Sequence, residues 1–185
     1  MPQPRRSRTL TRLTLSALFA AVLCILSPIA IPVGPIPMTL GLFGVLLAAA
    51  SLPPLASTLS VAVFLALGLC GLPVFSGGGS AAALVGPVGG YLWSYLLCAP
   101  LVSLLTRRIS PQATVGVSLA HGTLACLAGT LLCYACGTLQ FIAVTRSSPL
   151  SALLVCVLPF LPLDLLKCLL AASISRRLRQ FLACR

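Results

Sequence analysis

One acidic residue and one lysine stand three positions apart near the end of this chain, at Asp164 and Lys167, and no other Asp, Glu or Lys occurs in it. Residues three apart on a helix share a face and lie within reach of an ion pair. Each charge costs about 2.5–3.5 kcal/mol at the centre of a membrane helix. One interpretation is a structural salt bridge near the membrane edge. We favour a polar hook, in which one acceptor and one donor hold a small polar molecule at both ends.

A glycine cluster at residues 77–80 offers another kind of chemistry, because a glycine-rich backbone lets its N–H groups come close to a ligand. The positions concerned are Gly78, Gly79 and Ser80. A flexible external turn is the equal alternative. The cluster is not a phosphate-binding P-loop, which needs G-x-x-x-x-G-K-[ST], whereas the only lysine follows Leu166 with no glycine near it. No ATP site is therefore encoded here.

Several further residues carry polar or reactive groups within apolar sequence. Tyr91 adjoins a second glycine-rich turn and is either an interfacial aromatic residue or a cavity residue. Cys133 and Cys136 have CxxC spacing, but no second ligand pair accompanies them, so we expect core packing. His121 has no acid near it in the sequence and is expected to be a hydrogen-bonded core or interface residue.

The composition indicates whether these groups are surrounded by water or by lipid. Of 185 residues, 59% are hydrophobic and 7% are charged, against about 25% charged in an ordinary soluble domain. A soluble fold of this size needs far more polar surface than that. These values exclude a soluble enzyme, a nucleic-acid-binding module and a disordered tail, and they predict a chain embedded in a bilayer.

Six transmembrane helices account for the apolar runs, because one crossing needs about 20 apolar residues. After a basic segment 1–12, the spans are expected at about 13–31, 38–52, 54–71, 82–106, 114–137 and 162–180. Residues 138–161 are expected to be an external loop that folds back as a lid or short helix. The predicted fold class is thus an all-α membrane protein, with residues 1–185 forming a single integral membrane domain.

The basic residues predict the orientation. They cluster at the N-terminus (Arg5, Arg6, Arg8, Arg12), between the fourth and fifth spans (Arg107, Arg108) and at the C-terminus (Arg176, Arg177, Arg179, Arg185). Six spans place these clusters on one side and Arg146 on the other. By the positive-inside rule both termini are cytoplasmic, in the cell (cytoplasmic) membrane. The Gly/Pro-rich turns then lie outside, which predicts an outward-facing cavity.

Four segments together resemble the BioY family, the biotin-binding S components of energy-coupling factor (ECF) transporters. The segments begin at Gly71, Gly86, Gly137 and Val157 and read GLPVFSGGG, GPVGGY, GTLQ and VLPFLPLDLLK. The resemblance extends from the Pro-rich turn 32–37 to the last helix. Two positions depart from the family pattern: Val88 stands where a Thr is usual, and Gly41 where a Gln is usual.

This resemblance implies a six-helix S-component fold that captures biotin from outside with high affinity. It also implies docking on a membrane scaffold subunit that carries two cytoplasmic ATPase subunits, with the AxxxA pattern of Ala17 and Ala21 contacting the scaffold. No enzymatic activity and no cofactor are expected, since biotin is the transported ligand.

The same resemblance assigns roles in the pocket. Asp164 is expected to accept a ureido N–H of biotin, and Lys167 to meet either the carboxylate or the ureido carbonyl oxygen. Backbone around Gly78–Ser80 and the side chains of Tyr91 and Gln140 are expected to complete a mostly apolar pocket. The alternatives are an S component for another vitamin and a proton-coupled secondary transporter that uses Asp164 as its carrier.

Overall fold

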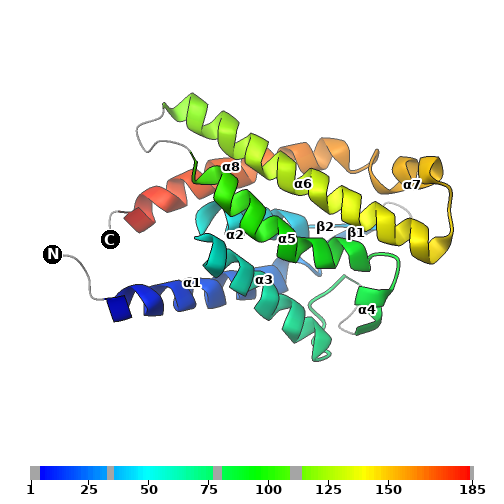
Figure 1. The fold of residues 1–185 in the computed structure, drawn as a ribbon, viewed down its shortest axis with the longest axis horizontal. Helices are drawn as coiled ribbons and strands as arrows, with labels where there is room; N and C mark the ends of the chain where they lie inside the picture. Colours follow the sequence, from blue (N-terminus) through cyan, green and yellow to red (C-terminus); the bar gives the residue numbers. More distant parts are fainter. Residues whose placement is uncertain (1–4, 33–35, 77–80, 109–113, 184–185) are drawn as a thin grey trace.

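The computed structural model describes residues 5–32, 36–76, 81–108 and 114–183, which form eight helices and one hairpin. The helices are α1 (Arg5–Leu26), α2 (Gly41–Ser51), α3 (Pro54–Leu69), α4 (Ala81–Val85), α5 (Gly89–Thr106), α6 (Val115–Thr145), α7 (Pro149–Cys156) and α8 (Leu161–Ala183). The strands β1 (Ala30–Pro32) and β2 (Pro37–Thr39) pair antiparallel between α1 and α2. Both ends of the chain lie at one end of the bundle, whereas α4 and α7 lie at the other end (Figure 1).

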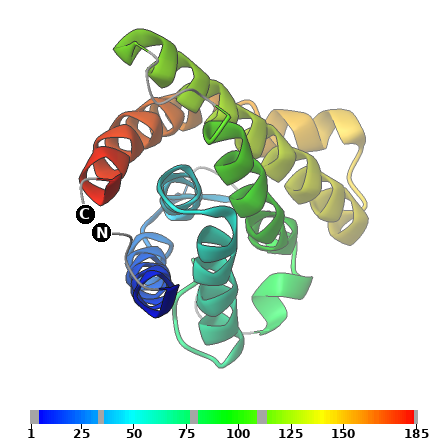
Figure 2. The same cartoon turned by 60° about the vertical axis from the view of Figure 1, so that its left-hand side comes forward.

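The short helix α2 forms the centre of the bundle. All of its residues except Phe43 and Leu47 are buried, and it contacts α1, α3, α5, α6 and α8. Figure 2 shows it in the middle of the surrounding helices. Because the residues of α2 are apolar or small on every side, this helix is suited to burial rather than to an amphipathic surface position.

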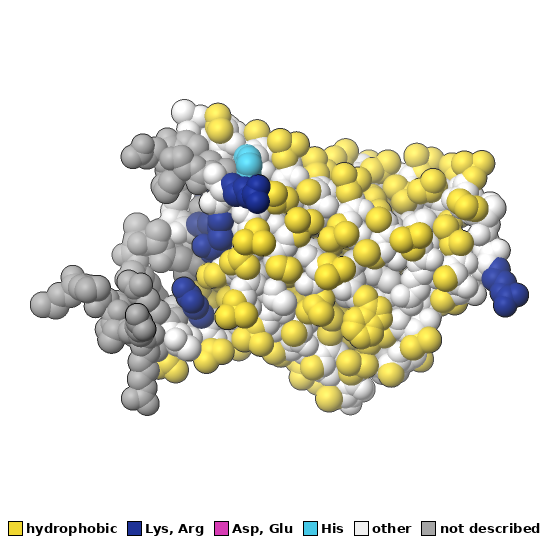
Figure 3. Space-filling model, in the orientation of Figure 1, with side chains coloured by type: hydrophobic (Ala, Val, Ile, Leu, Met, Phe, Trp, Pro, Cys, Tyr) yellow, Lys and Arg dark blue, Asp and Glu magenta, His cyan; other side chains and the backbone are white. Residues whose placement is uncertain are grey.

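The outside of the bundle is as apolar as its composition demands. Leucines such as Leu18, Leu97, Leu124 and Leu131 are exposed, and apolar side chains cover most of the face seen in Figure 3. Within the described residues, three stretches are long and apolar enough to cross a membrane: Thr9–Leu26, α5 and α6. The α7–α8 pair, bent by 53°, makes a fourth if it is counted as one span, while α2 and α3 are apolar but shorter.

Two of the expected spans are interrupted in the structure, and in both cases the interruption lies near Pro or Gly residues. The first expected span, 13–31, ends as a helix at Leu26, and the chain then forms the β-hairpin, which an all-α prediction omits. Pro32 and Pro37 explain this, because proline disfavours a continuing helix and is tolerated at a strand edge. The fourth expected span, 82–106, is divided into α4 and α5 at the turn that contains Gly86 and Pro87.

The segment 138–161 also differs from the expected external loop. Helix α6 continues to Thr145 instead of ending at residue 137, and α7 follows after a short break. Residues 138–145 contain no Gly or Pro, so nothing in them stops the helix. The break comes at Arg146, which has a left-handed backbone with φ 54° and precedes Pro149.

Helices α5 and α6 approach each other closely through glycines, and this contact positions Tyr91. A Cβ placed on Gly90 would lie 2.5 Å from the Cys136 carbonyl oxygen and 3.0 Å from the Gly137 Cα. A Cβ on Gly137 would overlap the ring of Tyr91. The side chains of Ser94 and Cys98 add contacts across the same interface, to Cys133 Sγ and the Gly129 carbonyl, both at 3.0 Å.

We expect Gly90→Ala to destabilise the bundle by about 1–3 kcal/mol, because a methyl group would meet backbone that cannot move aside. Gly116→Ala is the matched control: Gly116 lies in the first turn of α6 with no neighbouring atom near its Cβ position. Alanine favours a helix, so this control is expected to leave stability unchanged or slightly raised. Thermal unfolding of the detergent-solubilised protein, followed by circular dichroism, measures both. Equal stability of the two variants would contradict the close approach.

Candidate functional site

The Asp164–Lys167 pair lies inside the bundle, in the first turns of α8. Lys167 Nζ is 2.7 Å from Asp164 Oδ1, and the two residues are 4% and 8% exposed. Asp164 stands in the first helical turn, where the helix dipole favours a negative charge. The sequence prediction that both residues share one face of the last helix within ion-pair reach is therefore confirmed.

Two other elements complete the hydrogen bonding of this pair. The hydroxyl of Tyr134, on α6, donates to Asp164 Oδ2 over 2.6 Å, and Lys167 Nζ donates to the Thr39 carbonyl oxygen of β2 over 2.9 Å. Buried charges are stable only when such partners are present. The pair thus ties α8 to α6 and to the β-hairpin.

The ion pair lines a pocket of mostly apolar character between α5, α6, α8 and the hairpin. The space between its walls, open mouth included, is about 670 Å³. The apolar residues and two cysteines on its wall are Ile36, Pro37, Met38, Leu42, Val88, Leu92, Phe160, Cys133 and Cys156. Its polar side chains, besides the ion pair, are Ser27, Thr39, Ser76, Tyr91, Tyr95 and Tyr134.

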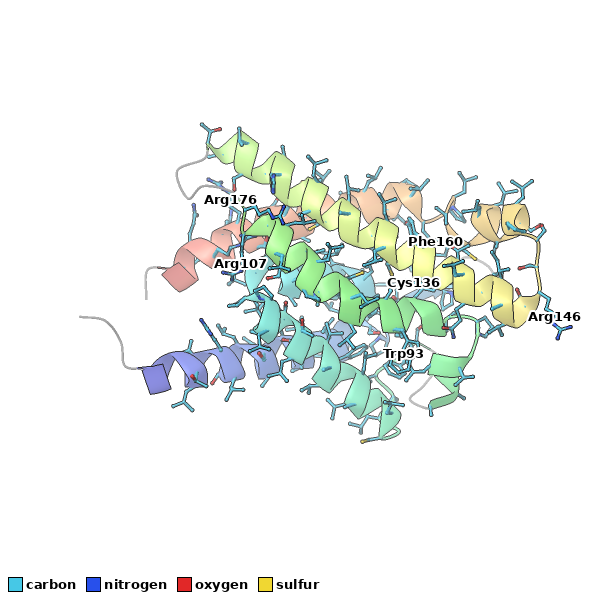
Figure 4. All side chains as sticks on the ribbon, viewed as in Figure 1. Trp93, Arg107, Cys136, Arg146, Phe160 and Arg176 are labelled. Carbon is cyan, nitrogen blue, oxygen red and sulfur yellow. The ribbon has the colours of Figure 1, made fainter. Side chains whose placement is uncertain are left out.

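All three tyrosines of the chain line this pocket. Tyr91 donates from its hydroxyl to the Cys156 carbonyl oxygen over 3.3 Å, which links α5 to α7. Tyr95, one helical turn further along α5, is 4% exposed. Of the two interpretations of Tyr91, the structure favours the cavity position over the interfacial one. Trp93, between the two tyrosines, is instead 48% exposed and points outward in Figure 4.

Sequence reasoning missed Tyr134 and Tyr95. Tyr134 lies between Cys133 and Cys136, in a segment whose CxxC spacing carries information only about the cysteines. The available signal was a tyrosine in the middle of an apolar span, since a buried hydroxyl needs a hydrogen-bond partner. Cys133 matches the packing interpretation, since it is 1% exposed and accepts a hydrogen bond from Ser94 Oγ, and its side chain also lines the pocket. Cys136 is half-buried.

Gln140 does not line the pocket. Its Nε2 donates to the carbonyl oxygens of Leu84 and Gly86, both at 2.9 Å, and so holds the turn between α4 and α5 against α6. The turn also requires a glycine at position 89, because a Cβ on Gly89 would overlap the Leu84 carbonyl oxygen. The structure thus gives Gln140 a role in positioning the turn that carries Val88, one residue of the pocket wall.

The remaining predicted residues fall in three places. Gly78, Gly79 and Ser80 lie outside the described residues, although Ser76, just before them, lines the pocket. Ala17 and Ala21 are exposed on α1, next to the exposed Leu18 and Ile25. His121 Nε2 lies 3.0 Å from the Leu105 carbonyl oxygen, at the C-terminal end of α5 and away from the pocket.

Both departures from the family pattern lie at the pocket. Val88 is on its wall, and a Cβ on Gly41 would lie 3.0 Å from Ser27 Oγ and 3.2 Å from the Tyr95 hydroxyl. The absence of a side chain at position 41 therefore lets Ser27 and Tyr95 lie close to the start of α2. A glutamine there would occupy space beside these two hydroxyl groups.

The site has the chemistry of binding. Among the residues that the structure describes, no group of three or more His, Cys, Asp or Glu side chains could hold a metal ion. The pocket offers a carboxylate, an ammonium group and several hydroxyls within apolar walls, an arrangement that orients a small ligand with a polar end and an apolar body.

Comparison with known proteins agrees with this geometry. The model of the BioY family matches residues 2–183. The Biotin transporter BioY of Thermotoga maritima is 37% identical over 168 residues, covering 89% of this chain and 94% of that protein. The Biotin transporter BioY of Rhodobacter capsulatus is 36% identical over 179 residues, covering 91% and 93%.

A solved structure extends the likeness to the whole fold. The crystal structure of the S-component for biotin from an ECF-type ABC transporter superposes with a TM-score of 0.85 and 32% sequence identity. The match covers 97% of this chain and 95% of that one. The chain is therefore an integral membrane protein that belongs to the BioY family.

Proposed function

We propose that this protein captures biotin and takes it up across the cytoplasmic membrane, as the substrate-binding S component of an ECF-type transporter. The observation that carries the proposal is the buried Asp164–Lys167 pair on the wall of a mostly apolar pocket, in a chain that belongs to the BioY family. The relatives named above support biotin as the ligand.

The polar groups of the pocket match the polar groups of biotin. The ureido ring has two N–H donors and one carbonyl acceptor, the fused sulfur ring is apolar, and the valerate chain ends in a carboxylate. Asp164 accepts a ureido N–H, and Lys167 donates to an oxygen of the ligand, either its carboxylate or its ureido carbonyl. Because Tyr134 and Lys167 each bond one oxygen of Asp164, they hold the carboxylate in one orientation for this contact.

Other parts of the pocket complete the contact with the ligand. Phe160, Leu92 and Met38 cover the sulfur ring and the valerate chain, and Tyr91 closes the side next to α7. Backbone N–H groups near Gly78, Gly79 and Ser80 are the proposed further donors, supported by the position of Ser76 on the pocket wall. Gln140 contributes indirectly, through the turn it holds.

The transport cycle needs partner subunits. The sequence contains no P-loop, so energy for uptake comes from a scaffold membrane subunit with two cytoplasmic ATPase subunits. Ala17 and Ala21 provide a small-residue surface for the scaffold, since both are exposed on α1 and permit close helix approach.

Six crossings give the arrangement in the membrane. Helices α1, α2, α3, α5, α6 and α8 cross, the hairpin extends the short α2, and α4 and α7 cover the external end. Arg107 and Arg176 lie at the end that holds the chain termini, and Arg146 lies at the opposite end (Figure 4). The positive-inside rule then makes the termini cytoplasmic and opens the pocket outward.

Replacing either member of the ion pair is expected to weaken biotin binding. Asp164→Asn removes a charged hydrogen bond and leaves Lys167 without its counter-charge, for a loss of about 1–3 kcal/mol. Lys167→Ala is expected to cost a similar amount. Isothermal titration calorimetry of the purified protein gives the dissociation constants. Unchanged affinity in both variants would remove the pair from the binding site.

Tyr134→Phe is expected to weaken binding by about 0.5–1.5 kcal/mol, the usual net contribution of one hydrogen bond. If the hydroxyl acts through Asp164, the loss should shrink when Asp164→Asn is already present, because the two groups then form one coupled unit. A double-mutant cycle on biotin affinity measures this coupling. Strictly additive losses would show that Tyr134 affects binding independently of Asp164.

A ligand panel separates this function from the neighbouring ones. Biotin is expected to bind more tightly than thiamine or riboflavin, neither of which combines a cyclic urea with a flexible carboxylate chain. Vesicles that contain the chain alone, without ATP or partners, are expected to accumulate no biotin. Tighter binding of another vitamin would change the substrate, and uptake that a protonophore abolishes would favour a proton-coupled transporter.

A further inference from the structure

Positive charges from three helices meet at the end of the bundle where the chain termini lie. Arg12 is on α1, Arg107 follows α5, and Arg179 is on α8. The charges of Arg12 and Arg107 repel each other, as do those of Arg107 and Arg179. Basic side chains gather at this end in Figure 3. No carboxylate side chain is available to neutralise them, because the only one in the chain is Asp164, in the pocket.

Arg179 has a fixed position but incomplete hydrogen bonding. Its Nη1 donates to the Thr106 carbonyl oxygen over 3.0 Å, at the C-terminus of α5, where a helix favours a cation. Its Nε is buried and has no hydrogen-bond partner among the described residues. A buried donor without a partner is costly, so this guanidinium group still lacks an acceptor.

The other two arginines supply free donors beside it. Arg12 and Arg107 are exposed, and neither guanidinium has a hydrogen-bond partner in the described part of the chain. Partial burial, and secondarily the charge of Arg12, lower the pKa of Arg107 from its usual value. An anion at this position would reduce the repulsion and accept hydrogen bonds from these donors.

Exposed apolar side chains close in sequence to two of the arginines indicate the kind of anion. Leu10 and Leu13 flank Arg12 on α1, and Leu104 precedes Arg107 on α5; they are 60%, 49% and 54% exposed. A phospholipid has both the phosphate that arginine binds in bidentate fashion and the acyl chains that such leucines cover. A free phosphate ion would leave the leucines without a partner.

We propose that Arg12, Arg107 and Arg179 form a binding site for the phosphate of an anionic phospholipid headgroup. The site lies at the opposite end of the molecule from α4 and α7, and it shares no residue with the ligand pocket. One bound lipid would contact arginines from α1, from the end of α5 and from α8, and would offset the repulsion between their charges.

Native mass spectrometry of the full chain tests the proposal. The protein is extracted from vesicles of equal parts phosphatidylglycerol and phosphatidylcholine, and the retained lipids are counted. Wild-type protein is expected to retain phosphatidylglycerol preferentially. The double variant Arg12→Gln with Arg107→Gln is expected to bind it at least about tenfold more weakly, because each arginine near a membrane surface strengthens binding of anionic lipid several-fold.

The matched control is Arg108→Gln with Arg177→Gln, which removes the same amount of charge from exposed positions outside the site, one just after α5 and one on α8. It is expected to retain the lipid as the wild type does. Biotin affinity, measured in both double variants, checks that each is folded. Equal lipid loss in the two double variants, or no preference for phosphatidylglycerol in the wild type, would overturn the proposal.

A second measurement separates the lipid from free phosphate. Phosphatidylglycerol is expected to raise the unfolding temperature of the detergent-solubilised wild type, and not that of Arg12→Gln with Arg107→Gln. Inorganic phosphate at the same concentration is expected to have a much smaller effect, since it lacks acyl chains. Equal stabilisation by inorganic phosphate would contradict a lipid site.

Discussion

The structure depends on keeping one ion pair in an environment that opposes charge. Transfer of a carboxylate and an ammonium group out of water costs several kcal/mol for each ion, and their mutual attraction offsets this only when the remaining hydrogen bonds are also made. Asp164 and Lys167 meet this condition through Tyr134 and the Thr39 carbonyl. Helices α6 and α8 and the β-hairpin must therefore meet at one place. A pocket wall with fixed polar groups is the direct consequence.

Small residues make this meeting place geometrically possible. Gly90 and Gly137 let α5 and α6 approach until backbone contacts backbone, which places Tyr91 against α6 and Tyr134 opposite α8. Gly41 acts similarly at the start of α2, where Ser27 and Tyr95 come close. Most polar groups of the pocket thus stand on closely packed helices, and such support preserves the geometry of a binding site when it is empty.

The sequence predicts some parts of the site better than others, for physical reasons. The ion pair was predictable because its residues are unique in composition and local in spacing. The partner of Lys167 was not, since a backbone carbonyl 128 residues away carries no side-chain signal. Gln140 shows the opposite difficulty: its polar side chain suggested ligand contact, yet two carbonyl groups of a nearby turn use its amide. Proline and glycine mark the breaks before α3 and between α4 and α5, but α6 continues through Gly137. Only tertiary pairing decides that Ala30–Pro32 and Pro37–Thr39 form a hairpin.

The scarcity of acidic residues has opposite consequences at the two ends of the bundle. In the pocket, one carboxylate is balanced by one ammonium group, so the ligand meets a neutral but strongly polar pair within apolar walls. At the end with the chain termini, arginines of three helices have no carboxylate side chain among them, and the lipid phosphate proposed above balances their charge. A membrane supplies anions there at high local concentration, so the charge distribution that orients the chain in the bilayer also makes its packing at that end depend on the lipid around it.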